Sequence, residues 1–294
     1  FHGCGVGEFL SEEVSRVMVT IRMISLSKGK SGVSYDLLKR FEMLLQRKIY
    51  PLIPSQGSVG ASGDLTPLSY VAAVIAGDRE CYYEGQIRDT AELYKELGVE
   101  PYVFKPKEAL GIMNGTAAMS AIAINAIEKF ETLLGTTESF VASIFELLLC
   151  DVTPLEPFVH DSKPFDGQRL TAANILAKCA DSKLTHEAFG RYDQFHLEAE
   201  QNIQDRYSIR CSPQVLGVVH DNLAIAKKWI ETEINGVNDN PLIDHVGRKI
   251  YTSGNFYGGY VCHAMDTMRI CAGNVADLLD KEFGLLVDHK FNKG

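Results

Sequence analysis

The sequence predicts a mainly α protein, a bundle of long helices. Apolar residues recur at helical spacing in several segments. The stretch from residue 117 to about 150 is apolar on more than one face, which is typical of a helix inside a bundle. The alternation of strands and helices that builds a parallel sheet is missing from the pattern. We expect residues 1–110 to be part of an N-terminal domain and residues 111–294 to form a truncated central long-helix bundle.

The first third of the chain contains helix starts that follow capping residues. Ser11, with two glutamates after it, predicts the start of one helix, and Ser34 predicts the start of a second that ends near Pro51. Thr66 and Pro67 are suited to cap and begin a short third helix. These segments carry apolar stripes, so we expect them to pack into a core.

The later elements are predicted from turn residues and from returning helical periodicity. They are a small hairpin or loop at 82–86, helices at 89–97, 168–179 and 212–229, a minor hairpin at 243–252, and a long final helix that begins near Ser253. The proline-containing stretch 151–167 is expected to be a connection or a bent helix.

Composition and charge exclude several classes of partner. The formal net charge is -9 without a block of like charges, which argues against nucleic acid and anionic membranes and leaves small polar substrates open. The seven cysteines are widely spaced and contain no Cys-x-x-Cys pair, so neither a disulfide framework nor a zinc site is indicated. A cytoplasmic location fits best. Because the sequence begins with Phe1 rather than Met, we expect it to be part of a longer protein.

One glycine-rich stretch does not fit an ordinary core or surface. Gly57, Gly60 and Gly63 recur at a spacing of three around Ser62, which indicates a tightly folded turn before a helix. In such a turn the amide nitrogen of Gly63 can reach the carbonyl carbon of Ala61. Ring closure and loss of water, also from the Ser62 hydroxyl, would leave an exocyclic methylidene. That group is an electrophile of a kind that no side chain supplies. A plain turn and helix cap is the alternative.

The segment Gly60-Ala61-Ser62-Gly63-Asp64-Leu65, followed by Pro67-Leu68, resembles the signature of the aromatic amino-acid ammonia-lyases and aminomutases. This family includes the histidine, phenylalanine and tyrosine ammonia-lyases. The resemblance implies the helical fold of histidine ammonia-lyase. It also implies a 4-methylidene-imidazol-5-one (MIO) group, formed autocatalytically from Ala61, Ser62 and Gly63, and no metal. It spans nearly all of this chain but only about the middle of a family member, so we expect a fragment.

Two polar segments outside this loop also resemble the family. Asn114 lies in a Met-Asn-Gly-Thr segment, and the resemblance implies that its amide supports the electrophile and the substrate carboxylate. A helix-capping role is the alternative. Phe256 follows Ser-Gly-Asn and would lie along the electrophile or the substrate ring, whereas a core aromatic is its alternative. The chain departs from the family at Tyr257 and at 163–168, which puts the substrate in doubt more than the chemistry.

A third polar segment contains Gln204, Tyr207 and Arg210 in a pattern similar to the family's Gln-Asp-x-Tyr-Ser-x-Arg-Cys. Arg210 is suited to a substrate carboxylate because a guanidinium makes two parallel charge-assisted hydrogen bonds. The resemblance implies that Tyr207 handles a proton beside the electrophile and that Gln204 orients it. The alternative for Arg210 is a surface ion pair with Asp205 or Glu200.

Phe1 and His2 are the clue to the substrate. The pair at this point differs with substrate among the resembling enzymes, and an aromatic residue followed by His is found in several bacterial tyrosine enzymes. A buried phenol hydroxyl needs a hydrogen-bond partner, which His2 could supply while Phe1 packs against the ring. Tyrosine is therefore favoured over histidine, with phenylalanine also open. The alternative is a loop histidine without a ligand.

The resemblance implies elimination of ammonia from an aromatic L-amino acid to give the arylacrylate, in a homotetramer whose sites take residues from more than one subunit. An aromatic amino acid 2,3-aminomutase is an alternative that the sequence does not separate from a lyase. An inactive structural helical bundle is an alternative of another class. A phosphate-binding glycine loop is disfavoured because the loop lacks a lysine and we expect no strand before it.

Overall fold

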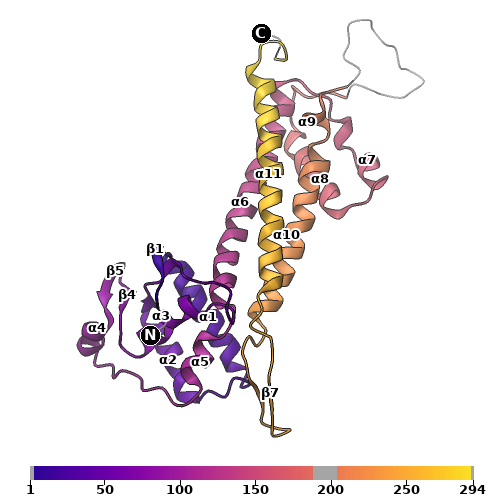
Figure 1. The fold of residues 1–294 in the computed structure, drawn as a ribbon. Coiled ribbons are helices and arrows are strands. Elements are labelled where there is room, and N and C mark those ends of the chain that lie inside the picture. The colour runs from indigo at the N-terminus through magenta and orange to yellow at the C-terminus, as the bar shows by residue number, and fades with distance from the viewer. Residues whose placement is uncertain (1–2, 188–203, 293–294) are drawn as a thin grey trace, which may run out of the picture. The chain divides into compact units, whose positions relative to one another are not determined.

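The computed structural model describes residues 3–187 and 204–292, and these residues are mainly helical, as the sequence predicts (Figure 1). They fall into two compact units. The first comprises Phe1–Ala126 and Lys228–His263, and the second comprises Ile127–Lys227 and Ala264–Gly294. The long helices contribute residues to both units. The boundaries between the units therefore differ from the expected domain boundary after residue 110. The expected domain boundary at residue 110 stays a prediction.

The first two helices begin where their capping serines predict. Helix α1 (Glu12–Ser27) follows Ser11, whose side chain accepts a hydrogen bond from the Val14 amide, and α2 (Tyr35–Arg47) follows Ser34. Helix α2 ends before the predicted Pro51, because Lys48 adopts a left-handed conformation with φ 55°.

Helix α3 (Leu65–Ile75) shows that the predicted cap at Thr66 is wrong. The helix begins after Asp64, and Thr66 lies in its first turn. Asp64 does not cap the helix with its side chain either, because its carboxylate accepts hydrogen bonds from Ser58 and from the backbone of Met119. The start of α3 is therefore set by a long-range contact that local sequence does not contain.

The strands of the first unit form small antiparallel sheets. Strand β1 (Val6–Phe9) pairs with β3 (Pro54–Gln56), and the predicted hairpin is confirmed as β4 (Glu80–Tyr83) and β5 (Gln86–Asp89), which β2 (Tyr50–Pro51) extends. The second predicted hairpin is confirmed as β6 (Leu242–Asp244) and β7 (Lys249–Tyr251). Strand β1 was not expected, since its segment reads as a glycine-rich loop. The expectation that no strand precedes the loop at Gly57 is wrong, because β3 ends at Gln56.

The core of the first unit is apolar and continuous. Helix α1 packs on α2, and α3 packs on α5 (Glu108–Met113), while α4 (Thr90–Leu97) follows the Asp89 cap. Met18, Phe41, Leu68 and Tyr94 are buried in this core. Fully burying such a side chain stabilises the fold by about 1.5–3 kcal/mol. This packing fixes the helices that carry the loops described below.

The second unit is built on long helices, as predicted. Parts of α6 (Ala117–Leu147), α10 (Ser212–Ile234) and α11 (Gly259–Val287) lie beside α8 (Asp166–Cys179) in it (Figure 1). The short elements are η1 (Thr153–Leu155), α7 (Pro157–Asp161) and α9 (Tyr207–Arg210). Glu138 of α6 joins three helices, since it accepts hydrogen bonds from Asn174 and contacts His220 at 2.8 Å.

The last helix begins six residues later than predicted. Ser253 does not start α11, because its backbone N–H donates to the side chain of Asn240 and its hydroxyl donates to the backbone of Asp239. The segment before Gly259 is thus held as a turn against the loop at Asp239. Among the described residues, no helix is long and apolar enough to cross a membrane.

Glu282 of α11 is a buried carboxyl group in the second unit. Its side chain is fully buried, and neither carboxyl oxygen has a hydrogen-bond partner among the described residues. Burial raises the pKa of this carboxyl from 4.5 to about 8. The native protein therefore holds a proton here at neutral pH that the unfolded chain releases.

We expect Glu282 to make the free energy of unfolding fall as pH rises from 4.5 to about 8. The native state binds the extra proton in this window, and the slope from one proton is at most about 1.4 kcal/mol per pH unit. Urea unfolding at several pH values should show a flatter dependence for Glu282→Gln, while Glu128→Gln, which changes an exposed glutamate of α6, keeps the wild-type slope. Equal slopes for Glu282→Gln and wild type would contradict the buried proton.

Candidate active site

The loop around Ser62 is the tight turn that the glycine spacing predicts. Gly60, Ser62 and Gly63 all have positive φ, at 71°, 50° and 78°. Unlike the two glycines, Ser62 has a Cβ atom, so a positive φ is strained at this residue. Its left-handed conformation must therefore be held by surrounding contacts. Ser62 is half-buried and Gly63 is buried.

Gly63 lies directly against the backbone of Gly115. The two residues form an isolated parallel bridge, and the Asp64 N–H donates to the Gly115 carbonyl oxygen at 2.7 Å. A Cβ at position 63 would overlap that oxygen and would lie 3.0 Å from the Phe256 carbonyl oxygen. Only glycine fits here. The contact therefore joins the Ser62 loop to the segments that carry Asn114 and Phe256.

Asp64 ties this loop to the start of α6. Its carboxylate accepts hydrogen bonds from the Met119 N–H at 2.8 Å and from the Ser58 hydroxyl at 3.0 Å. Burial raises the pKa of Asp64 to about 6, against these hydrogen bonds, which lower it. The Asp64 carboxyl group therefore has a pKa nearer to neutral pH than that of an exposed aspartate.

Arg22 of α1 is the main residue that the sequence analysis missed. Its guanidinium is fully buried and donates to the carbonyl oxygens of Gly111, Asn114 and Asn238. Burial lowers its pKa to about 10, so the group stays charged at neutral pH. A charged residue inside the apolar stripe of α1, next to Ile21, was the signal that could have identified it.

Arg22 also supports Gly115 from behind. A Cβ at position 115 would overlap the Arg22 guanidinium and would lie 2.7 Å from the Asn238 carbonyl oxygen. Gly115 thus lies close to both Arg22 and Gly63, with no room for a side chain.

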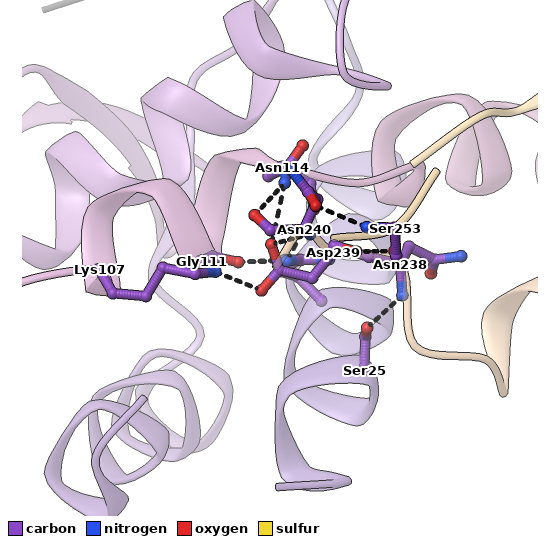
Figure 2. A network of polar contacts seen from close by, with 9 residues as sticks. Ser25, Lys107, Gly111, Asn114, Asn238, Asp239, Asn240 and Ser253 are labelled. Carbon is purple, nitrogen blue, oxygen red and sulfur yellow. Dashed lines mark hydrogen bonds and ion pairs between the residues drawn. The ribbon is translucent and has the colours of Figure 1, made fainter. Parts of the chain in front are cut away.

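Asn114 is held by a second buried network (Figure 2). Its amide nitrogen donates to the Asp239 carboxylate and to the Asn240 carbonyl oxygen, each at 3.0 Å. Lys107 makes an ion pair of 2.7 Å with the other oxygen of Asp239. The side-chain oxygen of Asn114 is buried and accepts no hydrogen bond from the described residues. Asn114 is the residue that ends α5, and its side chain caps no helix there, because its amide nitrogen is bound to Asp239 and Asn240.

Glu233 of α10 extends the polar network toward a cavity. It accepts hydrogen bonds from Thr116 at 2.6 Å and from the Asn238 side chain at 2.8 Å, and burial raises its pKa. The cavity has a volume of about 640 Å³ and lies between the end of α10 and the start of α11, where it is lined among others by Trp229, Glu233, Asn238, Tyr257, Tyr260 and His263. The Ser62 loop does not line it, so the cavity borders the network at Glu233 and Asn238.

The second unit contains the three expected site residues Gln204, Tyr207 and Arg210. Gln204 is exposed, and the ring of Tyr207 is 74% exposed. The Arg210 guanidinium lies 4.5 Å from that ring, and its Nε is buried without a hydrogen-bond partner among the described residues. Asp205 accepts a hydrogen bond from the Asp151 N–H. A cavity of about 510 Å³ along α10 and α11 includes Tyr207 in its lining.

The structure thus brings together part of the predicted site. Ala61–Gly63, Asn114 and the backbone of Phe256 converge in the first unit. The expected substrate residues Phe1 and His2 lie outside the described residues. Among the described residues, no cluster of three or more His, Cys, Asp or Glu side chains could hold a metal ion.

Comparison with known proteins places this geometry in a family. The model of the aromatic amino acid lyase family matches residues 1–294. The histidine ammonia-lyase of Shouchella clausii (strain KSM-K16) is 36% identical over 291 residues, which are 99% of this chain and 56% of that protein. The chain therefore spans about half the length of the curated relatives it matches.

Solved structures agree with the sequence matches. The phenylalanine aminomutase of Pantoea agglomerans superposes with a TM-score of 0.92 at 31% identity, over 99% of this chain and 58% of that one. The tyrosine aminomutase of Streptomyces globisporus superposes with a TM-score of 0.90 at 31% identity, over 100% of this chain and 57% of that one. The resemblance seen in the sequence and the expected helical fold are confirmed. The chain belongs to the aromatic amino acid lyase family.

Proposed function

We propose that this chain is part of an enzyme that eliminates ammonia from an aromatic L-amino acid to give the arylacrylate. The observation that carries the proposal is the Ala61–Gly63 loop, a strained turn whose last residue lies against Gly115 in a family member. No requirement of the core explains a half-buried serine held in this conformation between Ala61 and Gly63.

The residues present fit an MIO group formed from Ala61, Ser62 and Gly63. Gly63 has no room for a side chain, and Ser62 and Gly63 both have positive φ, which favours a chain folded back on itself. When formed, the group supplies an electrophile for the substrate amine, which side chains do not provide. Asp64, with a pKa of about 6, is the nearest carboxyl group in sequence to take up a proton released from the Gly63 amide nitrogen.

The other residues bind and orient the substrate. Arg210 holds the substrate carboxylate through two parallel hydrogen bonds, for which its buried and unpaired Nε leaves capacity. Tyr207, whose ring lies beside the Arg210 guanidinium, exchanges a proton at its hydroxyl, and Gln204 orients it. Phe256 packs along the aromatic ring of the substrate. We propose that the complete site takes residues from more than one copy of the chain, as the resemblance to the family implies.

The substrate we favour is tyrosine, because Phe1 and His2 offer an aromatic contact and a partner for a phenol hydroxyl. Histidine and phenylalanine are the other candidates. The histidine ammonia-lyase of Shouchella clausii supports histidine, while the two aminomutases among the structural neighbours support a second reaction, the 2,3-aminomutase reaction, which returns the amine to the β-carbon.

We further propose a cytoplasmic homotetramer. The long helices expose large apolar side chains, among them Val218, Ile225, Ile270 and Phe283. Exposed apolar patches of this kind are normally covered by another subunit. Sedimentation of the purified protein at the mass of a single chain would contradict this. In an alternative of another class, the protein is an inactive structural bundle.

The activity is tested on the full-length protein that contains this chain, by ammonia release from L-tyrosine, L-histidine and L-phenylalanine. We expect release from one of them, and we expect Ser62→Ala to abolish it, since alanine cannot form the electrophile. Ser27→Ala is the matched control, because Ser27 is exposed and bonds only to its own helix. Wild-type protein that releases ammonia from none of the three would contradict the proposal, and release by Ser62→Ala at the wild-type rate would exclude the role of Ser62.

The close fit of Gly63 is tested by two glycine substitutions. Gly60 and Gly63 both have positive φ, but a Cβ at position 60 meets no atom within 4 Å, whereas a Cβ at position 63 overlaps the Gly115 oxygen. Both alanine variants carry the backbone strain, and only Gly63→Ala also carries the steric overlap. We expect Gly63→Ala to lower the free energy of unfolding by about 1–3 kcal/mol more than Gly60→Ala, as measured by urea unfolding. Equal losses would show that residues 63 and 115 are not in contact.

A further inference from the structure

The segment that begins at Gly3 is held at two backbone points by Arg79 and Tyr70. The Arg79 guanidinium donates to the Gly3 carbonyl oxygen at 2.8 Å, and the Gly5 N–H donates to the Tyr70 hydroxyl at 3.1 Å. The guanidinium lies so close to Gly3 that a Cβ there would overlap it. The two side chains also contact each other, because the guanidinium carbon of Arg79 lies 4.3 Å from the centre of the Tyr70 ring.

Arg79 has a strained backbone in this position. Its φ is 65°, in the left-handed region that favours glycine. Its carbonyl oxygen accepts a hydrogen bond of 2.8 Å from the N–H of Thr90, a buried residue at the start of α4, so its backbone is fixed. Core packing does not explain an arginine here, because the residue is exposed. Strain at such a position indicates a role for the side chain, which contacts Gly3 and Tyr70.

The backbone of residues 3–5 has a fixed position relative to the Ser62 loop. Tyr70 is buried in α3, the helix that directly follows the loop. On the other side, β1 pairs with β3, the strand that directly precedes the loop. A Cβ at Gly57 would lie only 3.1 Å from the Gly5 Cα. Residues 3–5 are therefore held against the elements on both sides of the loop.

The Gly3 backbone is also the attachment point of a proposed substrate residue. His2 is joined directly to Gly3 in the sequence, and the proposed function gives His2 a hydrogen bond to the substrate ring. Neighbouring Cα atoms are about 3.8 Å apart across a trans peptide, so the position of Gly3 limits where His2 can place its imidazole. A displacement of about 1 Å is enough to weaken such a directed contact strongly.

We propose that Arg79, stacked on Tyr70, is a positioning residue for substrate selectivity: it holds Gly3 and thereby sets the point from which His2 reaches the substrate ring. The inference rests on the proposed function and deepens it, because that function gives neither Arg79 nor Tyr70 a role. A guanidinium is suited to this task. It is planar, so its face can stack on a ring while its edge donates hydrogen bonds.

Selectivity is measured on the full-length protein that contains this chain, as the kcat/KM for L-tyrosine divided by that for L-phenylalanine. The two amino acids differ only in the phenol hydroxyl, so the ratio reports the contact assigned to His2. L-histidine takes the place of L-tyrosine if it is the better substrate. Arg79→Gly should reduce the ratio by about 10- to 100-fold, through a higher KM for the preferred substrate. The kcat/KM for phenylalanine should change little.

A comparison of Arg79→Gly with Arg79→Ala separates positioning from structural support. Both variants lose the guanidinium, but only glycine also relieves the left-handed strain. We expect equal losses of selectivity, with the higher urea midpoint in Arg79→Gly. Arg248→Gly is the matched control, because Arg248 is also an exposed arginine with a positive φ, 51°, in the turn between β6 and β7. Its selectivity ratio should equal that of the parent protein.

A double-mutant cycle with His2→Leu tests whether Arg79 acts through His2. Leucine makes no hydrogen bond to the substrate, so His2→Leu lowers the ratio by itself, and Arg79→Gly in that background should change it no further. Tyr70→Phe keeps a ring under the guanidinium and removes the hydroxyl that accepts from Gly5. We expect it to give a smaller loss of selectivity than Arg79→Gly.

The outcomes are distinguishable. The positioning role is overturned by an unchanged ratio in Arg79→Gly, by an equal further loss in the His2→Leu background, or by losses that follow the urea midpoints. Each of these leaves the proposed function intact. A parent protein that prefers phenylalanine to both other amino acids also overturns the role, since no polar ring group is then selected. If the parent protein releases ammonia from none of the three, the proposed function fails, and this inference fails with it.

Discussion

The contact between Gly63 and the carbonyl oxygen of Gly115 is the constraint on which the rest of the site depends. It leaves no room for a Cβ at position 63, and it places a strained Ser62 directly before the contact. A backbone oxygen cannot move away as a flexible side chain can. The position of Gly115 therefore decides the conformation of the Ala61–Gly63 turn, and whatever holds Gly115 also holds the turn.

Two buried charged groups hold Gly115 and its neighbour Asn114. Arg22 donates to three carbonyl oxygens from segments far apart in sequence, and Asp239 binds Lys107 and Asn114. Charges are costly to bury unless their hydrogen bonds are made, and both Arg22 and Asp239 have their hydrogen bonds made in this network. Its effect is to present a strained loop and an unpaired acceptor from a rigid core.

Much of the fold could be predicted because its signals are local. Ser11 marks the start of α1, and the turn between β4 and β5 lies where its glycine predicts. The errors arise where distant residues decide. Thr66 was predicted to cap α3, but the helix begins after Asp64, whose carboxylate binds the Met119 N–H. Helix α11 begins later than predicted because Ser253 binds Asn240. Hydrogen bonds across such separations have no periodicity that a single sequence can reveal.

The site shows the same division. The loop residues 61–63 and Asn114 could be identified because their chemistry is unusual for a turn. Arg22 was missed because only the apolar residues of α1 were used to identify its buried face. The partners of Arg22, Gly111 and Asn238, lie 89 and 216 residues away in sequence. The direction of the Asn114 amide could not be read at all, since it follows from Asp239 rather than from Asn114.

The central claim is that the Ala61–Gly63 turn, compressed against Gly115, closes into a ring. The most direct test is the mass of the peptide that spans residues 59–65, released from the purified protein. The account predicts a mass lower than that of the sequence by two molecules of water, with the loss confined to residues 61–63. A peptide with the full mass of its sequence would contradict it.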